Sequence, residues 1–274
     1  MKSTGELEES LFADLDLNLD LEAITAKKAI TSVNVHGVLI PANLLLSRLH
    51  IFGQPLVHYT GDDTYQLHLI GSATGFEYKG EKLLICTEHQ LKQALGENVG
   101  IIVPEKQVFV SSAGYRQVKY NPALHEGDAF DLRVFDFDEQ SRVHPELGRR
   151  FFKFSSEQIL RDDDRVVGYL AYGCPFSDQN YDVYENNRLD TVIRPMLCRE
   201  HQSLSDDALG ACKTRIPMDF DPNGLSGGPV FALVLRNQEF ILKFAGIINR
   251  ASNSIIHFIK ARNVQRLLDM PATE

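Results

Sequence analysis

The stretch that decides the fold is Asp219-Phe-Asp-Pro-Asn-Gly224-Leu-Ser226-Gly-Gly228-Pro-Val-Phe231. A serine between glycines, followed by a proline and an apolar run, predicts a tight turn that leads into a strand. Glycines there let the backbone approach a ligand closely and let neighbouring amides point the same way. A Ser226 hydroxyl beside the backbone amides of Gly224 and Ser226 would suit acyl transfer, with the two amides as an oxyanion hole. The same turn is also compatible with a purely structural role.

Acyl transfer by a serine needs a base and an acid, and the sequence offers both. His89 comes directly after a predicted hairpin whose strands, 76–79 and 82–86, flank a Lys-Gly-Glu turn. Asp128 opens the stretch Asp128-Ala-Phe-Asp-Leu-Arg-Val134. The chain order His, Asp, Ser is one of the known orders of the serine triad. Asp131, three residues on and therefore on the opposite face of a strand, is a rival for the acid. We prefer Asp128, because the register of Leu132-Arg133-Val134 then fits the family pattern described below.

Composition excludes several classes of protein. The 274 residues carry a formal net charge of −9 and have no Lys/Arg-rich run, which argues against nucleic acid as a partner. Residues 1–22 are acidic without an apolar segment, and no run is long enough for a membrane span, so we expect neither a signal peptide nor a membrane partner. Four cysteines are too few for a disulfide scaffold and predict reduced thiols in the cytoplasm.

The pattern along the chain predicts an all-β protein with little helix. Residues 1–40 are expected to be an acidic extension, in which Leu15, Leu17, Leu19 and Leu21 alternate with polar residues; this is compatible with a strand or with a solvated leader. Residues 41–52 are compatible with a helix or a buried strand. Short strands in two groups, about 41–137 and about 161–270, predict two β-barrels joined by a polar linker, 138–160. A closing helix is predicted from Asn263, as its N-cap, to Leu268.

Several of these stretches resemble the chymotrypsin-like (trypsin-fold) serine peptidases, especially bacterial members of the HtrA kind. Gly224-Leu-Ser226-Gly-Gly-Pro229 resembles the family's nucleophile turn, and Gly71-Ser-Ala-Thr-Gly75-Phe76 its glycine-rich strand before the histidine. Asp128 to Val134 is similar to the stretch around the family's aspartate. Ala245 to Asn249 and His257 to Val264 are similar to its specificity-pocket strand and its final strand and helix. The resemblance covers residues 45–268, and we expect no PDZ-like domain.

The resemblance implies two six-stranded barrels, a C-terminal helix and a peptidase domain over residues 41–274. Ser226 would be the nucleophile, His89 the general base and then acid, and Asp128 the group that orients the imidazole. The amides of Gly224 and Ser226 would form the oxyanion hole. Substrate would lie extended beside Asn249, Arg250 and Ala251. Asp219, Phe220 and Asp221 would lie near the specificity pocket, which takes the substrate side chain just before the cleaved bond. The two aspartates would favour a basic side chain there, whereas Phe220 would make the pocket small or blocked. The sequence leaves both possibilities open.

Three residues depart from the family pattern. Glu88 takes the place of a small residue before the histidine; its carboxylate would either raise the imidazole pKa or point to solvent. Phe130 replaces an alanine in the aspartate stretch. Leu225 replaces the acid that secreted members pair with a new N-terminus after cleavage, so activation by that route is not expected; opening of the site would then depend on a partner or on residues 1–40.

Two metal sites were weighed against this assignment, and we predict no metal and no cofactor. Asp219-x-Asp221-x-Asn223-Gly224 matches the first half of a calcium loop, but Val230 replaces the final glutamate. Cys174, Cys198, His201 and Cys212 have irregular spacing for zinc. The expected function is a serine endopeptidase acting on protein or peptide substrates. The alternatives are a catalytically silent binding module of the same fold, and an enzyme that stays latent until a regulatory protein partner binds.

Overall fold

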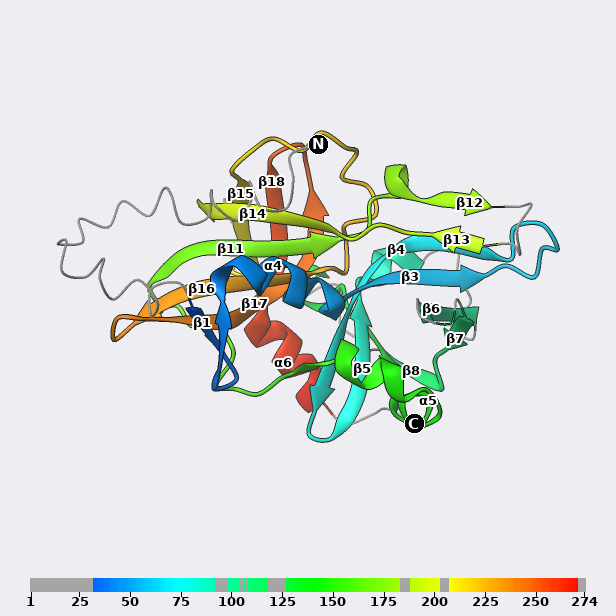
Figure 1. Ribbon diagram of the computed structural model, residues 1–274, viewed down its shortest axis with the longest axis horizontal. Coiled ribbons are helices and arrows are strands. Elements are labelled where there is room, and N and C mark those ends of the chain that lie inside the picture. Colours follow the sequence, from blue (N-terminus) through cyan, green and yellow to red (C-terminus); the bar gives the residue numbers. More distant parts are fainter. Residues whose placement is uncertain are drawn as a thin grey trace.

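The computed structural model describes residues 32–91, 98–103, 106, 108–117, 127–182, 188–202 and 207–270. Six strands in its C-terminal half form a closed antiparallel barrel, because β16 pairs with both β11 and β17 at the two ends of the order β16-β11-β14-β15-β18-β17. This barrel occupies the left half of Figure 1. Its strands are β11 (Val166–Gly173), β14 (Arg194–His201), β15 (Leu209–Thr214), β16 (Pro229–Arg236), β17 (Glu239–Ala251) and β18 (Ile255–Lys260). The mostly-β prediction is confirmed, and so is the second barrel.

The first strand group forms a curled sheet that is not closed by any pairing between its described ends. Its order is β7-β6-β3-β4-β5-β9-β8, so a closed six-stranded barrel is not what the described residues show here. The strands are β3 (Gly53–Tyr59), β4 (Leu67–Tyr78), β5 (Glu81–Cys86), β6 (Val99–Val103), β7 (Val108–Ser111), β8 (Gly114–Gln117) and β9 (Arg133–Asp136). The predicted hairpin is confirmed: Lys79 and Gly80, with φ of 50° and 87°, form the two-residue turn between β4 and β5.

The boundary predicted at residue 40 is wrong, because the described chain enters the second barrel earlier. β1 (Ser32–Val35) pairs in parallel with β17, and β2 (Val38–Pro41) pairs with β1 at the sheet edge. Val33 is fully buried in the main core. Residues 32–41 therefore belong to the body of the protein, while the predicted leucine alternation of residues 15–21 lies outside the described residues. The ambiguous stretch after β2 is helical: α4 (Ala42–Leu49) continues into a 3₁₀ turn, His50–Phe52.

The predicted polar linker is in fact the aromatic joint between the two units. It contains α5 (Asp138–Val143), a 3₁₀ helix (Pro145–Arg150) and β10 (Phe152–Lys153), which pairs in parallel with β4. Phe152 and Phe154 are buried and pack against phenylalanines of both sheets; the ring centroids of Phe152 and Phe231 are 5.1 Å apart, and those of Phe76 and Phe244 are 4.9 Å apart. Offset and edge-on aromatic pairs of this kind stabilise a core beyond the area that they bury.

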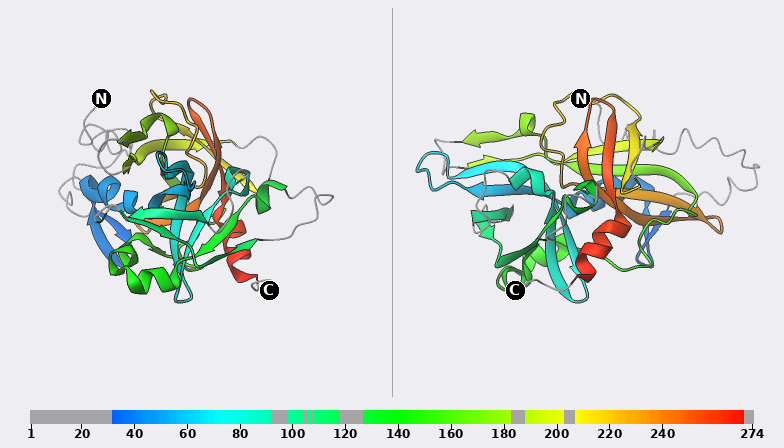
Figure 2. Two further views of the ribbon diagram at one scale, coloured as in Figure 1. Left: turned by 90° about the vertical axis from the view of Figure 1, so that its right-hand side faces the viewer. Right: turned by 180° about the vertical axis from the view of Figure 1, so that it is seen from behind.

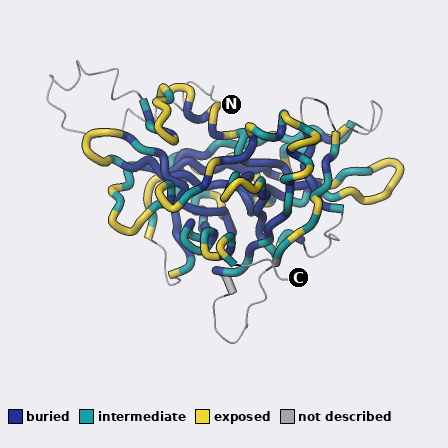
Figure 3. The backbone as a smooth tube through the Cα atoms, turned by 90° about the horizontal axis from the view of Figure 1, so that it is seen from below, coloured by how far each residue is buried: buried dark blue, intermediate teal, exposed yellow. Residues whose placement is uncertain are grey.

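The C-terminal helix α6 (Ala261–Asp269) lies at the junction of the two units, as Figure 2 shows from behind. It begins two residues before the predicted Asn263, after Lys260 in extended conformation. At its other end the Asp269 carboxylate accepts a hydrogen bond from the Tyr78 hydroxyl (2.6 Å) and pairs with the Lys79 ammonium (2.7 Å) on the β4–β5 hairpin. The helix thus fastens the second barrel to the first sheet. The buried backbone runs through the middle of the molecule in Figure 3.

A short hairpin of β12 (Asn180–Asp182) and β13 (Arg188–Asp190) extends beside β3 and β4. Leu189 from it joins a small apolar cluster with Val57, Leu69 and Cys174. In the described part of the chain, no helix has the length and apolar character needed to cross a membrane.

The aromatic joint predicts a specific stability effect. Phe152→Ala removes a fully buried ring between the two sheets, so we expect it to lower the free energy of unfolding by about 3–5 kcal/mol. Val143→Ala, at the exposed end of α5, serves as the control and is expected to change it by less than about 0.5 kcal/mol. Urea unfolding followed by circular dichroism measures both. Equal changes in the free energy of unfolding for the two variants would show that the Phe152 ring does not stabilise the joint between the units.

Candidate active site

Three side chains from distant parts of the chain meet where the two units join. His89 lies in a one-turn 3₁₀ helix (Glu88–Leu91) after β5, and Ser226 lies in the turn before β16. The imidazole Nδ1 is 2.6 Å from the Asp131 Oδ2, and Nε2 is 3.3 Å from the Ser226 Oγ. The His89 side chain is 40% exposed, so it is open to a substrate from solvent, whereas Asp131 is 18% exposed. This is the geometry of a nucleophile, a base and an orienting acid.

The carboxylate that contacts the His89 imidazole is that of Asp131, and not that of Asp128 as the sequence favoured. That preference rested on the register of Leu132-Arg133-Val134, with Asp128 and Asp131 on opposite faces of a strand. Residues Gly127–Phe130 instead form a 3₁₀ helix, and β9 begins only at Arg133. Asp131 follows the helix, in the bend that leads into β9. The face alternation of a strand therefore does not apply here.

Asp131 is held by contacts that also set the backbone around the histidine. Its Oδ1 accepts the backbone N–H of His89 (2.9 Å), and its own carbonyl oxygen accepts the N–H of Glu88 (3.2 Å). Oδ2 also accepts the side-chain amide of Asn249 (2.7 Å), which comes from β17 of the other unit. These hydrogen bonds fix the orientation of the carboxylate and, through it, of the imidazole that it faces.

Glu88, the first departure from the family pattern, is engaged by an arginine. Its carboxylate accepts two hydrogen bonds from Arg133, Nε at 2.8 Å and Nη2 at 2.6 Å. The guanidinium also lies over the ring of Tyr115, 4.5 Å from the centroid. Such a two-point pair has fixed geometry and neutralises the carboxylate. Glu88 therefore supports the turn that carries His89, and neither of the two roles expected for it describes its position.

The serine turn is anchored through its carbonyl oxygens to β4 of the other unit. Ser72 donates its N–H to the Ser226 oxygen (3.0 Å) and its hydroxyl to the Gly224 oxygen (2.7 Å). The Thr74 hydroxyl donates to the Gly227 oxygen (2.8 Å). Ser72 and Thr74 stand in the glycine-rich stretch that we singled out, but nothing in the sequence indicates that their hydroxyls hold the turn.

With the carbonyl groups turned toward β4, the amides of the turn are left for a ligand. Within the described part of the chain, the N–H groups of Gly224 and Ser226 have no hydrogen-bond partner. Gly224 has φ of +98°, and a Cβ there would lie 2.4 Å from the Cys174 carbonyl oxygen. Only glycine fits this position. Two free amides beside a hydroxyl are what an oxyanion hole requires, as the sequence predicts.

Leu225 holds the serine turn in place by apolar packing. Its side chain is fully buried in the core of the second barrel. It packs closely on β11, where a Cβ on Gly173 would lie 2.7 Å from the leucine Cδ2. A leucine here needs no charged partner, so the turn reaches its conformation without an ion pair at this position.

The Ser226 hydroxyl lies between two acceptors. It donates to the backbone oxygen of Asn249 (2.7 Å), while Nε2 of His89 is 3.3 Å away. A hydroxyl has one proton, so transfer to the histidine requires rotation about the Cβ–Oγ bond. Long nucleophile-to-base distances are common in sites without substrate and shorten when it binds.

The residues predicted to bind substrate fall into different environments. Asn249 is buried at a bulge in the β17–β18 ladder, where it contacts the triad. Arg250 is exposed and Ala251 is half-buried at the end of β17. Phe220 is half-buried, packs against the apolar core of the second barrel and lies under the Arg194 guanidinium (5.5 Å). Their role toward substrate stays a prediction.

The two rejected metal sites do not assemble in the described residues. The Asp221 carboxylate accepts the N–H and side-chain amide of Asn223, which makes a local turn. Among the described residues, no group of three or more His, Cys, Asp or Glu side chains has an arrangement that could hold a metal ion. Cys198 and Cys212 are buried in one cluster and Cys174 in another. Burial raises the pKa of the Cys174 thiol to about 12, so this thiol is not a nucleophile.

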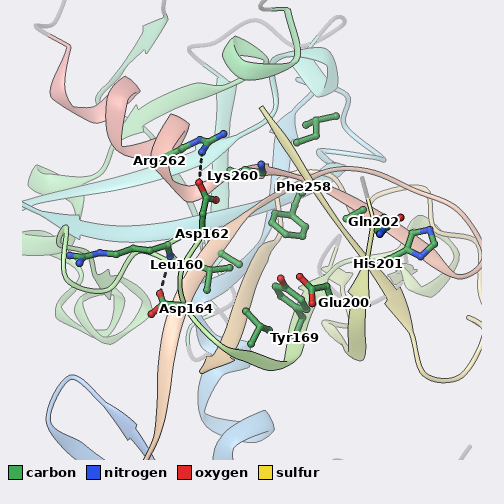
Figure 4. A pocket seen from close by; sticks show the side chains of 16 residues that line it. Leu160, Asp162, Asp164, Tyr169, Glu200, His201, Gln202, Phe258, Lys260 and Arg262 are labelled. Atoms are coloured by element: carbon green, nitrogen blue, oxygen red, sulfur yellow. Dashed lines mark hydrogen bonds and ion pairs between the residues drawn. The ribbon is translucent and has the colours of Figure 1, made fainter. Parts of the chain in front are cut away.

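A separate cavity of about 600 Å³ opens on the second barrel, and none of the triad residues line it (Figure 4). Its wall includes Tyr169, Glu200 and Phe258. At its rim the Arg262 guanidinium pairs with the Asp162 carboxylate, and the Asp164 carboxylate accepts the backbone N–H of Arg161 and pairs with Arg236. Nothing in this wall favours one ligand class, so we assign it none.

The protein has a trypsin-like fold: a curled first sheet, a closed second barrel and a C-terminal helix, with a His–Asp–Ser cluster at the joint. No protein-family model matches the sequence, and no curated protein does. Two similar solved structures are the scabies mite inactivated protease paralogue S-D1, with 9% identity over 81% of this chain and 94% of the other (TM-score 0.48), and the VesB protease of Vibrio cholerae, with 12% identity over 79% and 62% (TM-score 0.42). The HtrA kind stays a prediction.

The choice between the two aspartates can be tested directly. Asp131→Asn should slow labelling of Ser226 by a fluorophosphonate by a factor on the order of 10⁴, because the imidazole loses its orienting carboxylate. Asp128→Asn, the control, should leave the rate unchanged. Labelling is followed by intact mass spectrometry. A loss with Asp128→Asn and none with Asp131→Asn would reverse the assignment.

Proposed function

We propose that this chain is a serine endopeptidase that hydrolyses peptide bonds of protein or peptide substrates through an acyl-enzyme on Ser226. The observation that supports this most is the position of His89, whose two ring nitrogens face the Asp131 carboxylate and the Ser226 hydroxyl. The trypsin-like fold is compatible with both a peptidase and a protein without catalysis. The proposal therefore depends on the site and not on the fold.

The geometry suits acyl transfer in two halves. The Ser226 proton passes to Nε2 of His89 as Oγ bonds to the substrate carbonyl carbon, and the developing oxyanion accepts the N–H groups of Gly224 and Ser226. Nε2 then gives the proton to the leaving amine nitrogen as the C–N bond breaks. In the second half, water gives a proton to Nε2 and attacks the ester; the proton returns to Oγ as the acid leaves. Asp131 stabilises the imidazolium in both halves.

A catalytically silent binding module of the same fold is the second candidate, and one observation favours it. The Ser226 hydroxyl donates to the Asn249 carbonyl oxygen at 2.7 Å, a shorter distance than that to His89. If that bond persists with substrate present, the nucleophile is never activated. A third candidate, an enzyme that becomes active only with a regulatory partner, shares the proposed chemistry.

We also propose a reducing compartment, the cytoplasm, for this protein. All four cysteines are buried free thiols. Disulfides are rare in reducing compartments and frequent in secreted proteins.

Fluorophosphonate labelling separates these candidates. We expect stoichiometric labelling of the wild type at Ser226 and none of Ser226→Ala, because only an activated hydroxyl attacks the phosphorus atom. Ser47→Ala, on α4 and far from the site in the chain, is the control and should label like the wild type. A folded wild type that never labels would support the binding module. Labelling of the purified protein that occurs only after a cell extract is added would support the latent enzyme.

A further inference from the structure

Gln90, the residue directly after the histidine, connects the histidine turn to the serine turn. It lies in the 3₁₀ helix Glu88–Leu91, and its side chain is partly buried between the two units. None of the sequence patterns singles it out. Both ends of its amide are engaged, one on each side of the cleft that the triad spans.

The oxygen end of the Gln90 amide fixes the start of the histidine turn. Oε1 accepts the backbone N–H of Thr87 (2.8 Å) and also the Thr87 hydroxyl (2.6 Å). Thr87 itself is fully buried. These two bonds hold the backbone at the point where β5 ends and the turn that presents His89 begins.

The nitrogen end of the Gln90 amide reaches the serine turn. Nε2 donates to the carbonyl oxygen of Ser226 at 2.8 Å, and its second hydrogen faces the Ser72 carbonyl oxygen at 3.2 Å. The Ser226 oxygen thus receives two donors, Gln90 and the Ser72 N–H. Two donors on that oxygen fix the plane of the peptide that follows the nucleophile.

Two glycines make room for this amide. A Cβ on Gly71 would lie 2.0 Å from the Gln90 Nε2, and a Cβ on Gly227 would lie 2.9 Å from its Oε1. Both glycines have positive φ, +140° and +87°. The backbone on each side is therefore shaped to accept the glutamine side chain, which a loosely placed surface residue would not require.

We propose that Gln90 is a positioning residue that sets the distance between the Ser226 hydroxyl and the His89 imidazole. This inference rests on the proposed peptidase function. Gln90 contacts only Thr87 and backbone carbonyl groups, so it acts through the triad and not on substrate. Its loss should lower the rate of acylation more than it weakens substrate binding, because a displacement of about 1 Å can cost on the order of 10²-fold in rate.

Two substitutions separate positioning from general stability. Gln90→Met keeps the length of the side chain and removes both hydrogen-bonding ends, so we expect fluorophosphonate labelling to fall by roughly 10–100-fold at every pH. Gln90→Glu faces the carbonyl oxygens of Ser72 and Ser226, and only its protonated form can donate to one of them. Because the carboxyl oxygen that replaces Nε2 faces only carbonyl oxygens, the neutral carboxyl is favoured there. The ratio of the labelling rate of this variant to that of the wild type should therefore be highest at low pH and fall as pH rises.

Gln202→Met and Gln202→Glu, at an exposed position outside the site, are the matched controls and should label like the wild type at each pH. The melting temperature is measured for all four variants. Rates that fall only in proportion to the unfolded fraction would overturn the inference. So would wild-type labelling rates in both Gln90 variants.

Crystal structures of the wild type and Gln90→Met provide a readout that does not need activity. We expect the distance between Ser226 Oγ and His89 Nε2 to increase beyond that of the wild type. An unchanged distance would overturn the positioning role. A longer distance together with a wild type that never labels would support the positioning role and contradict the proposed peptidase function.

Discussion

The hydrogen bonds from β4 to the carbonyl oxygens of the serine turn are the constraint on which the site depends. Ser72 and Thr74 belong to one folding unit, and Gly224, Ser226 and Gly227 belong to the other. These bonds engage the carbonyl groups of the turn, while the amides of Gly224 and Ser226 have no partner among the described residues. The same bonds bring β5 and the histidine turn beside the nucleophile. The hydrogen bonds that join the two units therefore also form the site.

Apolar packing around this joint holds the serine turn and the two sheets in place. Phe152 and Phe154 from the connecting segment fill the space between the sheets, and Leu225 holds the turn from the apolar core. The charged groups nearby are paired, as Glu88 is with Arg133. Preorganised donors are most effective in a site that does not have to rearrange during the reaction. The contacts that join the two units therefore also hold His89, Asp131 and Ser226 close together.

The sequence predicted the features that depend on local chemistry. Glycines around Ser226 and a two-residue turn before β5 are local signals, so the nucleophile turn and the hairpin that carries His89 were found. The register of Leu132-Arg133-Val134 favours Asp128 over Asp131, because it does not reveal the 3₁₀ helix Gly127–Phe130 that comes before Asp131. The polar residues of 138–160 predict a linker, because the burial of the phenylalanines among them depends on two sheets that are distant in the chain. The open first sheet and the docking of β1 on β17 are equally long-range properties, and no local pattern encodes them.

The most direct test of a working nucleophile is a crystal structure of the wild type soaked with a peptide boronic acid. We predict a tetrahedral boron bonded to the Ser226 Oγ, with one boron oxygen within hydrogen-bond distance of the Gly224 and Ser226 amides, and Nε2 of His89 facing the adduct. The boronate is used at a concentration that modifies an active serine peptidase. An unmodified Ser226 whose hydroxyl still donates to the Asn249 carbonyl oxygen would then contradict the claim that Ser226 is a working nucleophile.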